Sequence, residues 1–361
     1  MGLGSRISAL FGRSDEDGLS VPPLDGVLKP NQDLDAAERL FDIPLIDNLI
    51  AADGALYCSS GNTLLRLDLE TRRSETVRVL AGPITAIAVS PEGRLAVAVE
   101  GAGVSLLAGS VDDDRQLAVP GEYGGCITAL LFEAADLILM AIGSRKHRMS
   151  EWKRDLMSHG ATGAVIRHHI PSSKTEVMRG GLAFPYGLAF GNDGDILVSE
   201  SWRHRILSLR TGKNLLAELP AYPARLSPAT GGGYWLALFA PRRQLTELVL
   251  REDDYRLEMM ATIPPDAWIG PDFSDGGNEE QPLQSGSVRQ MGIMKPWAPS
   301  RSYGLVVRLD AEMAPVASHH SRADGHIHGV ASVVERDGAL YVASRGAGAL
   351  VRLHLEPGAS T

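Results

Sequence analysis

Several side chains that could do chemistry stand where short apolar segments begin or end. Tyr186 opens the first of two strand-like segments in FPYGLAFGNDGDILVSES (184–201), and Glu200 closes the second. His326 and His328 precede another apolar run, and two residues apart they would share one face of a strand. A histidine can act as a general base near neutral pH. Two histidines could also begin a metal site, although no third ligand is evident.

Common catalytic motifs are missing, and composition narrows the possible partners. The sequence contains no G-x-S-x-G, H-E-x-x-H or C-x-x-C motif. The net charge of −9 argues against nucleic acid or an anionic membrane as a partner and favours small molecules or proteins. With Cys58 and Cys126 as the two cysteines, a disulfide framework is not expected and a cytoplasmic location is predicted. The oligomeric state stays open.

The N-terminal region does not resemble a targeting segment. Its apolar stretch is about six residues long, which is shorter than a signal peptide needs, and no run approaches a membrane span. We therefore expect residues 1–37, rich in Gly, Pro, Asp and Ser, to be a loosely ordered leader that lies along the body.

One pattern recurs six times and predicts the elements that position these side chains. Each copy is a short apolar strand, in most copies a turn built on Asp, Glu or Gly, and a second apolar strand, the form of a β-hairpin. The copies lie at 47–60, 84–99, 126–143, 186–201, 224–238 and 328–344.

A further strand precedes each hairpin, and another follows most of them. Four strands repeated six times predict an all-β, six-bladed β-propeller over residues 38–356, followed by a short tail, 357–361. RLFDI (39–43) would then close the ring as the outer strand of the last blade.

Two blades are interrupted between their second and third strands. The insertion 144–163 carries Met149, Trp152, Leu156 and Met157 at helical spacing. The insertion 240–302 begins with a helix-like stretch and continues through the polar loop DFSDGGNEEQPLQSGS. Both are expected to cover one mouth of the central channel, where long loops often carry function.

In the order and spacing of its motifs, the chain resembles the strictosidine synthase-like proteins. The resemblance rests on KHRMSEWKRDLMSHGATGAVIRH, GGLAFPYGLAF, ILVSESWRHRIL, ELPAYPARLSPATGGGYWLAL, SYGLVVRLD and VVERDGALYVAS, and covers roughly residues 38 to 355. These proteins form a branch of the six-bladed propellers that also includes calcium-dependent lactonases of the gluconolactonase and paraoxonase type.

The resemblance implies that the calcium site of the lactonase branch is altered here. The positions that match its ligands carry Tyr186, Ile127 with Thr128, and Ala224 with Arg225. Asp47 and Asn48 alone keep ligand chemistry, so no catalytic metal and no other cofactor is expected.

In the metal-free branch, the resemblance implies a base just before the inner strand of the last blade. A glutamate serves there in the condensation of an amine with an aldehyde, and the matching residue here is His328. Arg225 would suit an anionic or carbonyl-bearing ligand. Tyr186, Glu200 and His147 would line the mouth.

Each of these roles has a structural alternative. His328 could be hydrogen-bonded to a neighbouring blade, Arg225 could pair with Asp47, Glu200 could cap a turn, and His147 could be a solvated loop residue. The pairs His168–His169 and His319–His320 are expected at the surface.

Three functions remain open. The first is a metal-independent enzyme, hydrolytic or condensing, with His328 as base and Tyr186 and Arg225 orienting the substrate. The second is a calcium lactonase with a rearranged site, and the third is a propeller that binds a ligand or protein without catalysis.

Overall fold

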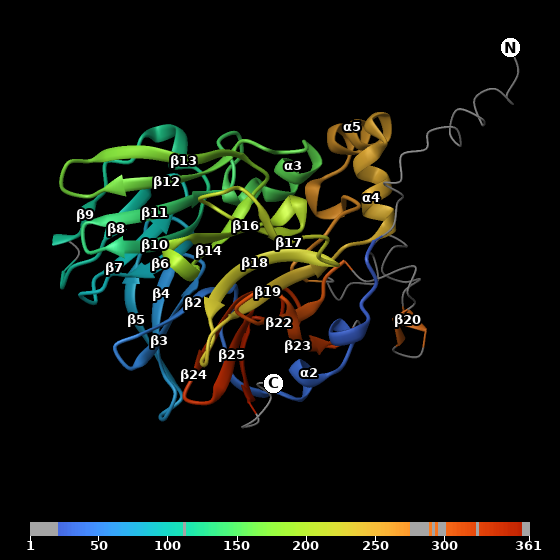
Figure 1. Cartoon of the computed structure of the whole chain (residues 1–361), viewed down its shortest axis with the longest axis horizontal. Coiled ribbons are helices and arrows are strands. Elements are labelled where there is room, and N and C mark those ends of the chain that lie inside the picture. The colour runs from blue at the N-terminus through green and yellow to red at the C-terminus, as the bar shows by residue number, and fades with distance from the viewer. Residues whose placement is uncertain are drawn as a thin grey trace, which may run out of the picture.

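Six antiparallel sheets of four strands follow one another along the chain, in the order that the repeats predict (Figure 1). The computed structural model describes residues 21–110, 113–274, 289–290, 293–294, 301–322 and 325–355. The prediction of a six-bladed β-propeller is confirmed.

The strands of each blade are given from the channel outward. Blade one holds β2 (Ile46–Ala52), β3 (Ala55–Ser60), β4 (Thr63–Asp68) and β5 (Arg73–Val79). Blade two holds β6 (Ile84–Val89), β7 (Leu95–Val99), β8 (Gly103–Leu106) and β9 (Arg115–Gln116). Blade three holds β10 (Ile127–Ala134), β11 (Leu137–Ile142), β12 (Gly163–His169) and β13 (Lys174–Leu182).

The second half of the ring repeats this arrangement. Blade four holds β14 (Pro185–Phe190), β15 (Ile196–Glu200), β16 (Arg205–Ser208) and β17 (Asn214–Leu216). Blade five holds β18 (Ala221–Pro228), β19 (Tyr234–Pro241), β22 (Gly304–Leu309) and β23 (Pro315–Ser321). Blade six holds β24 (Val330–Arg336), β25 (Ala339–Ser344), β26 (Ala349–His354) and, from the other end of the chain, β1 (Glu38–Asp42).

The N-terminal strand closes the ring as predicted. β1 pairs antiparallel with β26, with Glu38 opposite Arg352 and Asp42 opposite Ala349. Leu40 and Phe41 of this strand are buried. The first and last strands therefore share one sheet, and β26 is not left as its free outer edge.

Residues 21–37 are bound to blade five. They contain η1 (Gly26–Leu28) and α2 (Asp33–Ala36), and α2 lies beside β23 (Figure 1). Asn31 accepts a hydrogen bond from the backbone N–H of His320 at 2.8 Å, and Asp35 accepts one from the hydroxyl of Ser321 at 2.7 Å. This part of the expected leader is thus held by specific contacts along the body, while residues 1–20 lie outside the described residues.

The apolar core lies between neighbouring blades. One cluster, for example, joins Ala86 and Ala96 of blade two to Ile127 and Ile138 of blade three. Another joins Leu40 of β1 to blades one and six. The two inner strands of each blade are buried on both faces and therefore read as short apolar runs, whereas outer strands such as β5 are largely exposed.

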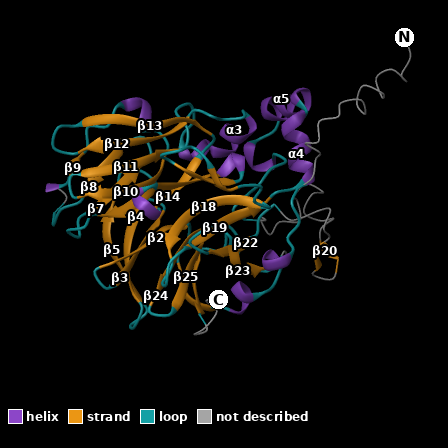
Figure 2. Cartoon of the chain, viewed as in Figure 1, coloured by secondary structure: helices purple, strands orange, loops and turns teal. Residues whose placement is uncertain are grey.

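The remaining helices gather mainly in the two insertions, on one side of the molecule (Figure 2). The first insertion holds η4 (Met149–Glu151) and α3 (Trp152–Met157), as its spacing predicts. The second holds α4 (Gln244–Arg251), α5 (Asp253–Thr262), η7 (Pro265–Ala267) and the short strands β20 (Arg289–Gln290) and β21 (Ile293–Met294). Residues 275–287 of the expected polar loop lie outside the described residues. Elsewhere there are η3 (Gly121–Tyr123), η5 (Asn192–Gly194) and η6 (Ser201–Arg203). No helix in the described ranges is long and apolar enough to cross a membrane.

Every inner strand carries an irregularity at the same place near its start. Its register against the second strand shifts there, as at a β-bulge. The residues inside the shifts are Asn48 with Leu49, Thr85, Thr128, Tyr186, Ala224 with Arg225, and Ala331. Bulges leave backbone groups unpaired and redirect side chains, and they are frequent next to functional sites.

Candidate functional site

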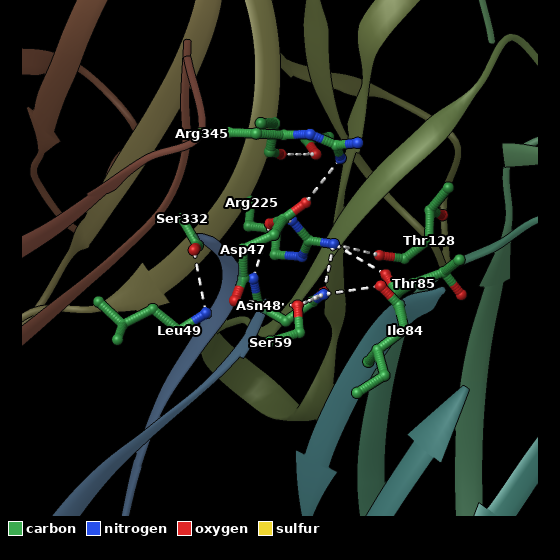
Figure 3. A network of polar contacts seen from close by, with 12 residues as sticks. Asp47, Asn48, Leu49, Ser59, Ile84, Thr85, Thr128, Arg225, Ser332 and Arg345 are labelled. Atoms are coloured by element: carbon green, nitrogen blue, oxygen red, sulfur yellow. Dashed lines mark hydrogen bonds and ion pairs between the residues drawn. The ribbon is translucent and has the colours of Figure 1, made fainter. Parts of the chain in front are cut away.

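Arg225 reaches from its bulge across the channel to three other blades (Figure 3). Its Nη1 donates to Asp47 Oδ1 at 2.5 Å. Its Nη2 donates to Asn48 Oδ1 at 2.6 Å and to the backbone oxygens of Thr85 at 2.9 Å and Thr128 at 3.2 Å. The predicted alternative, a pairing of Arg225 with Asp47, is thus present.

Local backbone geometry holds the acceptors in place. Asn48 has a left-handed φ of 56°. Its side-chain amide nitrogen donates to Ser59 Oγ at 2.8 Å, and this hydrogen bond turns the amide oxygen toward Arg225. Gly187 lies against the Arg225 backbone, and a Cβ there would meet the Ala224 oxygen at 2.8 Å. The glycine after Tyr186 therefore lets blade four approach blade five closely.

The network extends to the remaining two blades. Arg345, just after β25 of blade six, donates to Asp47 Oδ2 at 3.2 Å (Figure 3). The Tyr186 ring of blade four lies 5.0 Å from the Arg225 guanidinium carbon, a cation–π distance. All six blades therefore contribute to one buried polar network.

Tyr186 is buried beside this network. It is 1% exposed, and its hydroxyl has no hydrogen-bond partner among the described residues. Burial, with a smaller contribution from Asp47, raises the pKa of Tyr186 to about 12, so the phenol stays protonated at neutral pH. The enclosed ring and its contacts fit a channel-lining aromatic rather than an acid.

A cavity of about 280 Å³ lies between the end of the channel and the blade-three insertion. Asp47, Thr85, Glu100, Trp152 and Arg345 are among the residues that line it. Glu100 is held toward the insertion by the Ser150 backbone N–H at 2.8 Å. The cavity thus combines carboxylates, one guanidinium and an aromatic face, a combination that suits a polar small molecule.

The two insertions meet over this end of the channel. Lys153 of α3 donates to Asp272 Oδ2 at 2.6 Å, and Arg301 donates to the same oxygen at 2.9 Å. Phe273 packs edge-on against Trp152, with ring centroids 5.5 Å apart, and the Arg345 guanidinium carbon lies 4.6 Å from its ring centre. As predicted from the sequence, the insertions cover one mouth.

A second cavity, of about 630 Å³, occupies the rest of the channel on the other side of Arg225. Inner strands of all six blades line it, mostly with Leu, Ile, Val and Ala. The Arg225 network therefore lies between a polar cavity under the insertions and a larger, more apolar one.

His328 lies outside the Arg225 network. Its Nδ1 is 2.8 Å from Ser302 Oγ, and its Nε2 is 2.8 Å from the Arg322 backbone oxygen, which can only accept. With Nε2 as donor, Nδ1 accepts from the Ser302 hydroxyl. A base role for His328 stays a prediction, and it requires one of these hydrogen bonds to open.

Glu200 and His147 lie elsewhere on the same face. Glu200 is fully buried, and it accepts from Arg203 at 2.7 Å and from the Ala183 backbone N–H at 2.6 Å, so its contacts fit the structural alternative. His147 is half-buried at the start of the blade-three insertion, and its backbone N–H donates to Ser144 Oγ at 3.1 Å. Asp47 is the predicted site residue that lines the smaller cavity.

Sequence reasoning missed Glu100 and Arg345. Both come directly after the second strand of a blade, at the end of β7 and β25. In two other blades the matching position, directly after the second strand, is held by Gly61 and Ser201. Comparing this position across the repeats would have identified both residues, whereas the predictions compared the starts of inner strands.

The surface placement expected for two histidine pairs is corrected in part. His168 and His320 are fully buried, because their neighbours His169 and His319 take the outward face of each strand. Burial lowers the pKa of His320 to about 4.

Fold and network together define a six-bladed propeller with a guanidinium-centred polar site at one end of its channel.

No family model matches the chain. In sequence, the chain is 24% identical to the adipocyte plasma membrane-associated protein of Danio rerio over an alignment of 254 positions that covers 62% of this chain. A stretch of 139 residues is 28% identical to strictosidine synthase-like protein 10 of Arabidopsis thaliana and covers 37% of each chain. These relatives confirm the resemblance to strictosidine synthase-like proteins.

The structural comparison supports the fold. A gluconolactonase from Xanthomonas campestris superposes with a TM-score of 0.54 at 14% identity, over 88% of this chain and 89% of its own. The chain spans about three fifths (61%) of the length of the Danio rerio relative. The activity of the whole protein is therefore a matter for proposal.

Proposed function

We propose that the chain is a metal-independent enzyme, hydrolytic or amine–carbonyl condensing, that acts on an anionic or carbonyl-bearing small molecule. The observation that carries this proposal is the cavity under the insertions, where the Asp47 carboxylate and the Arg345 guanidinium lie 3.2 Å apart. A carboxylate can take a proton from the attacking nucleophile, and a guanidinium beside it can donate hydrogen bonds to the carbonyl oxygen under attack.

The roles of these groups follow from their chemistry. Arg345 has 31% of its side chain exposed, so it can turn part of its fork toward a carbonyl or carboxylate oxygen. Asp47 Oδ1 is held by Arg225, while Oδ2 faces Arg345 and can accept a proton from an attacking water or amine. The Trp152 face offers an apolar wall for the substrate.

The residues here do not fit the calcium ion of the lactonase branch. The guanidinium of Arg225 lies among the oxygens of Asp47, Asn48, Thr85 and Thr128, so a second cation at that point would meet a fixed positive charge. No step is therefore assigned to a metal, and no cofactor is proposed.

Non-catalytic ligand binding is the second candidate, and one observation favours it. His328, Glu200 and Arg225 all use their polar atoms in contacts within the protein. Such a network can serve to shape a pocket without doing chemistry.

Catalysis can be tested with a panel of lactones, aryl esters and amine–aldehyde pairs, assayed with and without a chelator. We expect turnover that the chelator leaves unchanged. Asp47→Asn and Arg345→Ala should each lower kcat/KM at least about 100-fold, whereas Glu122→Gln, at an exposed carboxylate, should not change it. His328→Ala tests the other base that the resemblance implies: if His328 rather than Asp47 takes the proton, catalysis should collapse while binding persists, and if Asp47 takes it, kcat/KM should change little.

The outcomes separate the candidates. A calcium requirement, or turnover that survives both cavity variants, would contradict the proposal. Native mass spectrometry that shows a bound organic molecule, without turnover of any panel member, would favour the ligand-binding candidate.

A further inference from the structure

The Arg225 guanidinium is surrounded by the kinds of atom that surround a bound metal ion. Its four acceptors are one carboxylate oxygen, one amide oxygen and two backbone carbonyls, at 2.5 to 3.2 Å. Calcium selects this mixture of oxygens in proteins. A typical surface arginine, by contrast, pairs with one carboxylate and is otherwise hydrated.

The acceptors are prepared by the fold rather than by Arg225 itself. Thr85 and Thr128 lie at bulges of β6 and β10, where the irregular register leaves carbonyls turned into the channel. Asn48 is fixed by its own hydrogen bonds to Ser59 and to the Ile84 backbone oxygen. These groups come from blades one, two and three, so no single strand holds the set of oxygens together.

We propose that Arg225 is a resident cation: its guanidinium takes the place of a bound ion in a preformed oxygen cage. Removing the guanidinium would uncover a cation-binding site made of Asp47, Asn48 and the Thr85 and Thr128 carbonyls. In the native chain the positive charge is tethered covalently, so it cannot dissociate with the calcium concentration. The inference concerns this charge alone and holds whether or not the protein is an enzyme.

Arg345 provides a matched comparison, because it contacts the same carboxylate from outside the cage. It donates to Asp47 Oδ2 and has no hydrogen bond to the Asn48, Thr85 or Thr128 oxygens. Loss of Arg345 thus removes a guanidinium from Asp47 while the cage stays filled. Loss of Arg225 empties the cage and leaves Asp47 paired on one side.

The test compares Arg225→Ala, Arg345→Ala and the unmodified chain by thermal unfolding and by isothermal titration calorimetry. Calcium chloride and guanidinium chloride are added separately as ligands, each up to about 20 mM. For Arg225→Ala we expect saturable binding in the millimolar range, because the cage has one carboxylate, and a rise in Tm of about 2–4 °C with either cation. The other two proteins should show neither effect.

Should Arg225→Ala fail to fold alone, refolding from urea with and without 20 mM calcium gives the same information. A soluble yield at least about threefold higher with calcium would support the resident-cation proposal, provided that calcium does not raise the yield of Arg345→Ala. If neither cation binds Arg225→Ala or improves its refolding, or if Arg345→Ala responds equally, the proposal is wrong and Arg225 is only a cross-link between strands.

Discussion

The Tyr186 side chain is costly to bury, because its hydroxyl has no hydrogen-bond partner among the described residues. An unpaired buried hydroxyl costs about 1–3 kcal/mol. We therefore expect Tyr186→Phe to leave the Tm unchanged or to raise it, as measured by calorimetry. Tyr222→Phe is the matched control, since the Tyr222 hydroxyl is also buried and unpartnered, whereas the ring that lies under the Arg225 guanidinium is that of Tyr186.

The same variant tests a role for the hydroxyl in recognition. If the substrate supplies its missing partner, Tyr186→Phe should weaken substrate binding about tenfold while Tyr222→Phe should not. A clear loss of stability in Tyr186→Phe would instead show that the hydroxyl is satisfied in the free protein.

The lowered pKa of His320 makes the free energy of unfolding depend on pH. Its folded pKa, about 4, lies below the ordinary value of about 6.5, so the folded state keeps the ring neutral while the unfolded state takes up a proton. The free energy of unfolding should therefore fall as the pH drops below about 6.5, by about 1.5–2 kcal/mol by pH 5. Buried His204, whose pKa burial also lowers, adds to the loss.

Urea unfolding at pH 7, 6 and 5 measures this slope. His320→Asn should be less stable at pH 7 but should lose less on acidification, whereas His354→Asn, at an exposed position, should keep the full slope. Parallel curves for the His320 variant and the unmodified chain would contradict the assignment.

The residues of the site could be identified only in part from the sequence. The resemblance to the calcium-dependent branch matched Asp47, Tyr186 and Arg225 to one site, and the structure joins all three. The sequence could not decide which acceptors Arg225 reaches, because they lie 97 to 178 residues away along the chain. His328 precedes the bulge at Ala331, and its ring is hydrogen-bonded to Ser302 at the end of the blade-five insertion.

At the scale of elements, the blade-five insertion docks on blade six through glycines. The Phe273 backbone passes so close to Gly346 that a Cβ there would lie 2.0 Å from the Phe273 oxygen. We expect Gly346→Ala to push Phe273 away, loosen the insertion and lower stability by about 1–3 kcal/mol. Limited proteolysis should then cut within 240–302, and Trp152 fluorescence should change.

Gly180→Ala is the control for this substitution, because a Cβ at Gly180 would meet nothing within 4 Å. If Gly346→Ala and Gly180→Ala are cleaved alike, the insertion is not held at this contact. The helix in each insertion was predictable from apolar spacing, but the link between them was not. It depends on Lys153 and Asp272, which are charged residues without a local pattern.

At the scale of the whole molecule, the ring was the most predictable feature, since six copies of one hairpin pattern specify it independently of any single contact. What repetition cannot specify is how strongly the ring depends on its closing strand. β1 buries Leu40 and Phe41, each worth about 1.5–3 kcal/mol, and Glu38 of this strand pairs with Arg352. The two side chains together contribute about 3–6 kcal/mol, comparable with the lower end of the stability of an ordinary domain, about 5–15 kcal/mol.

Two truncations isolate that contribution. A chain that begins at residue 38 keeps β1 and should unfold cooperatively at a lower Tm, because it loses the contacts of α2 with β23. A chain that begins at residue 44 leaves β26 as a free edge, and we expect it to lose cooperative unfolding and near-ultraviolet circular dichroism throughout. If the shorter chain unfolded with the same Tm and enthalpy as the longer one, β1 would be dispensable, and the ring would be held by the interfaces between blades alone.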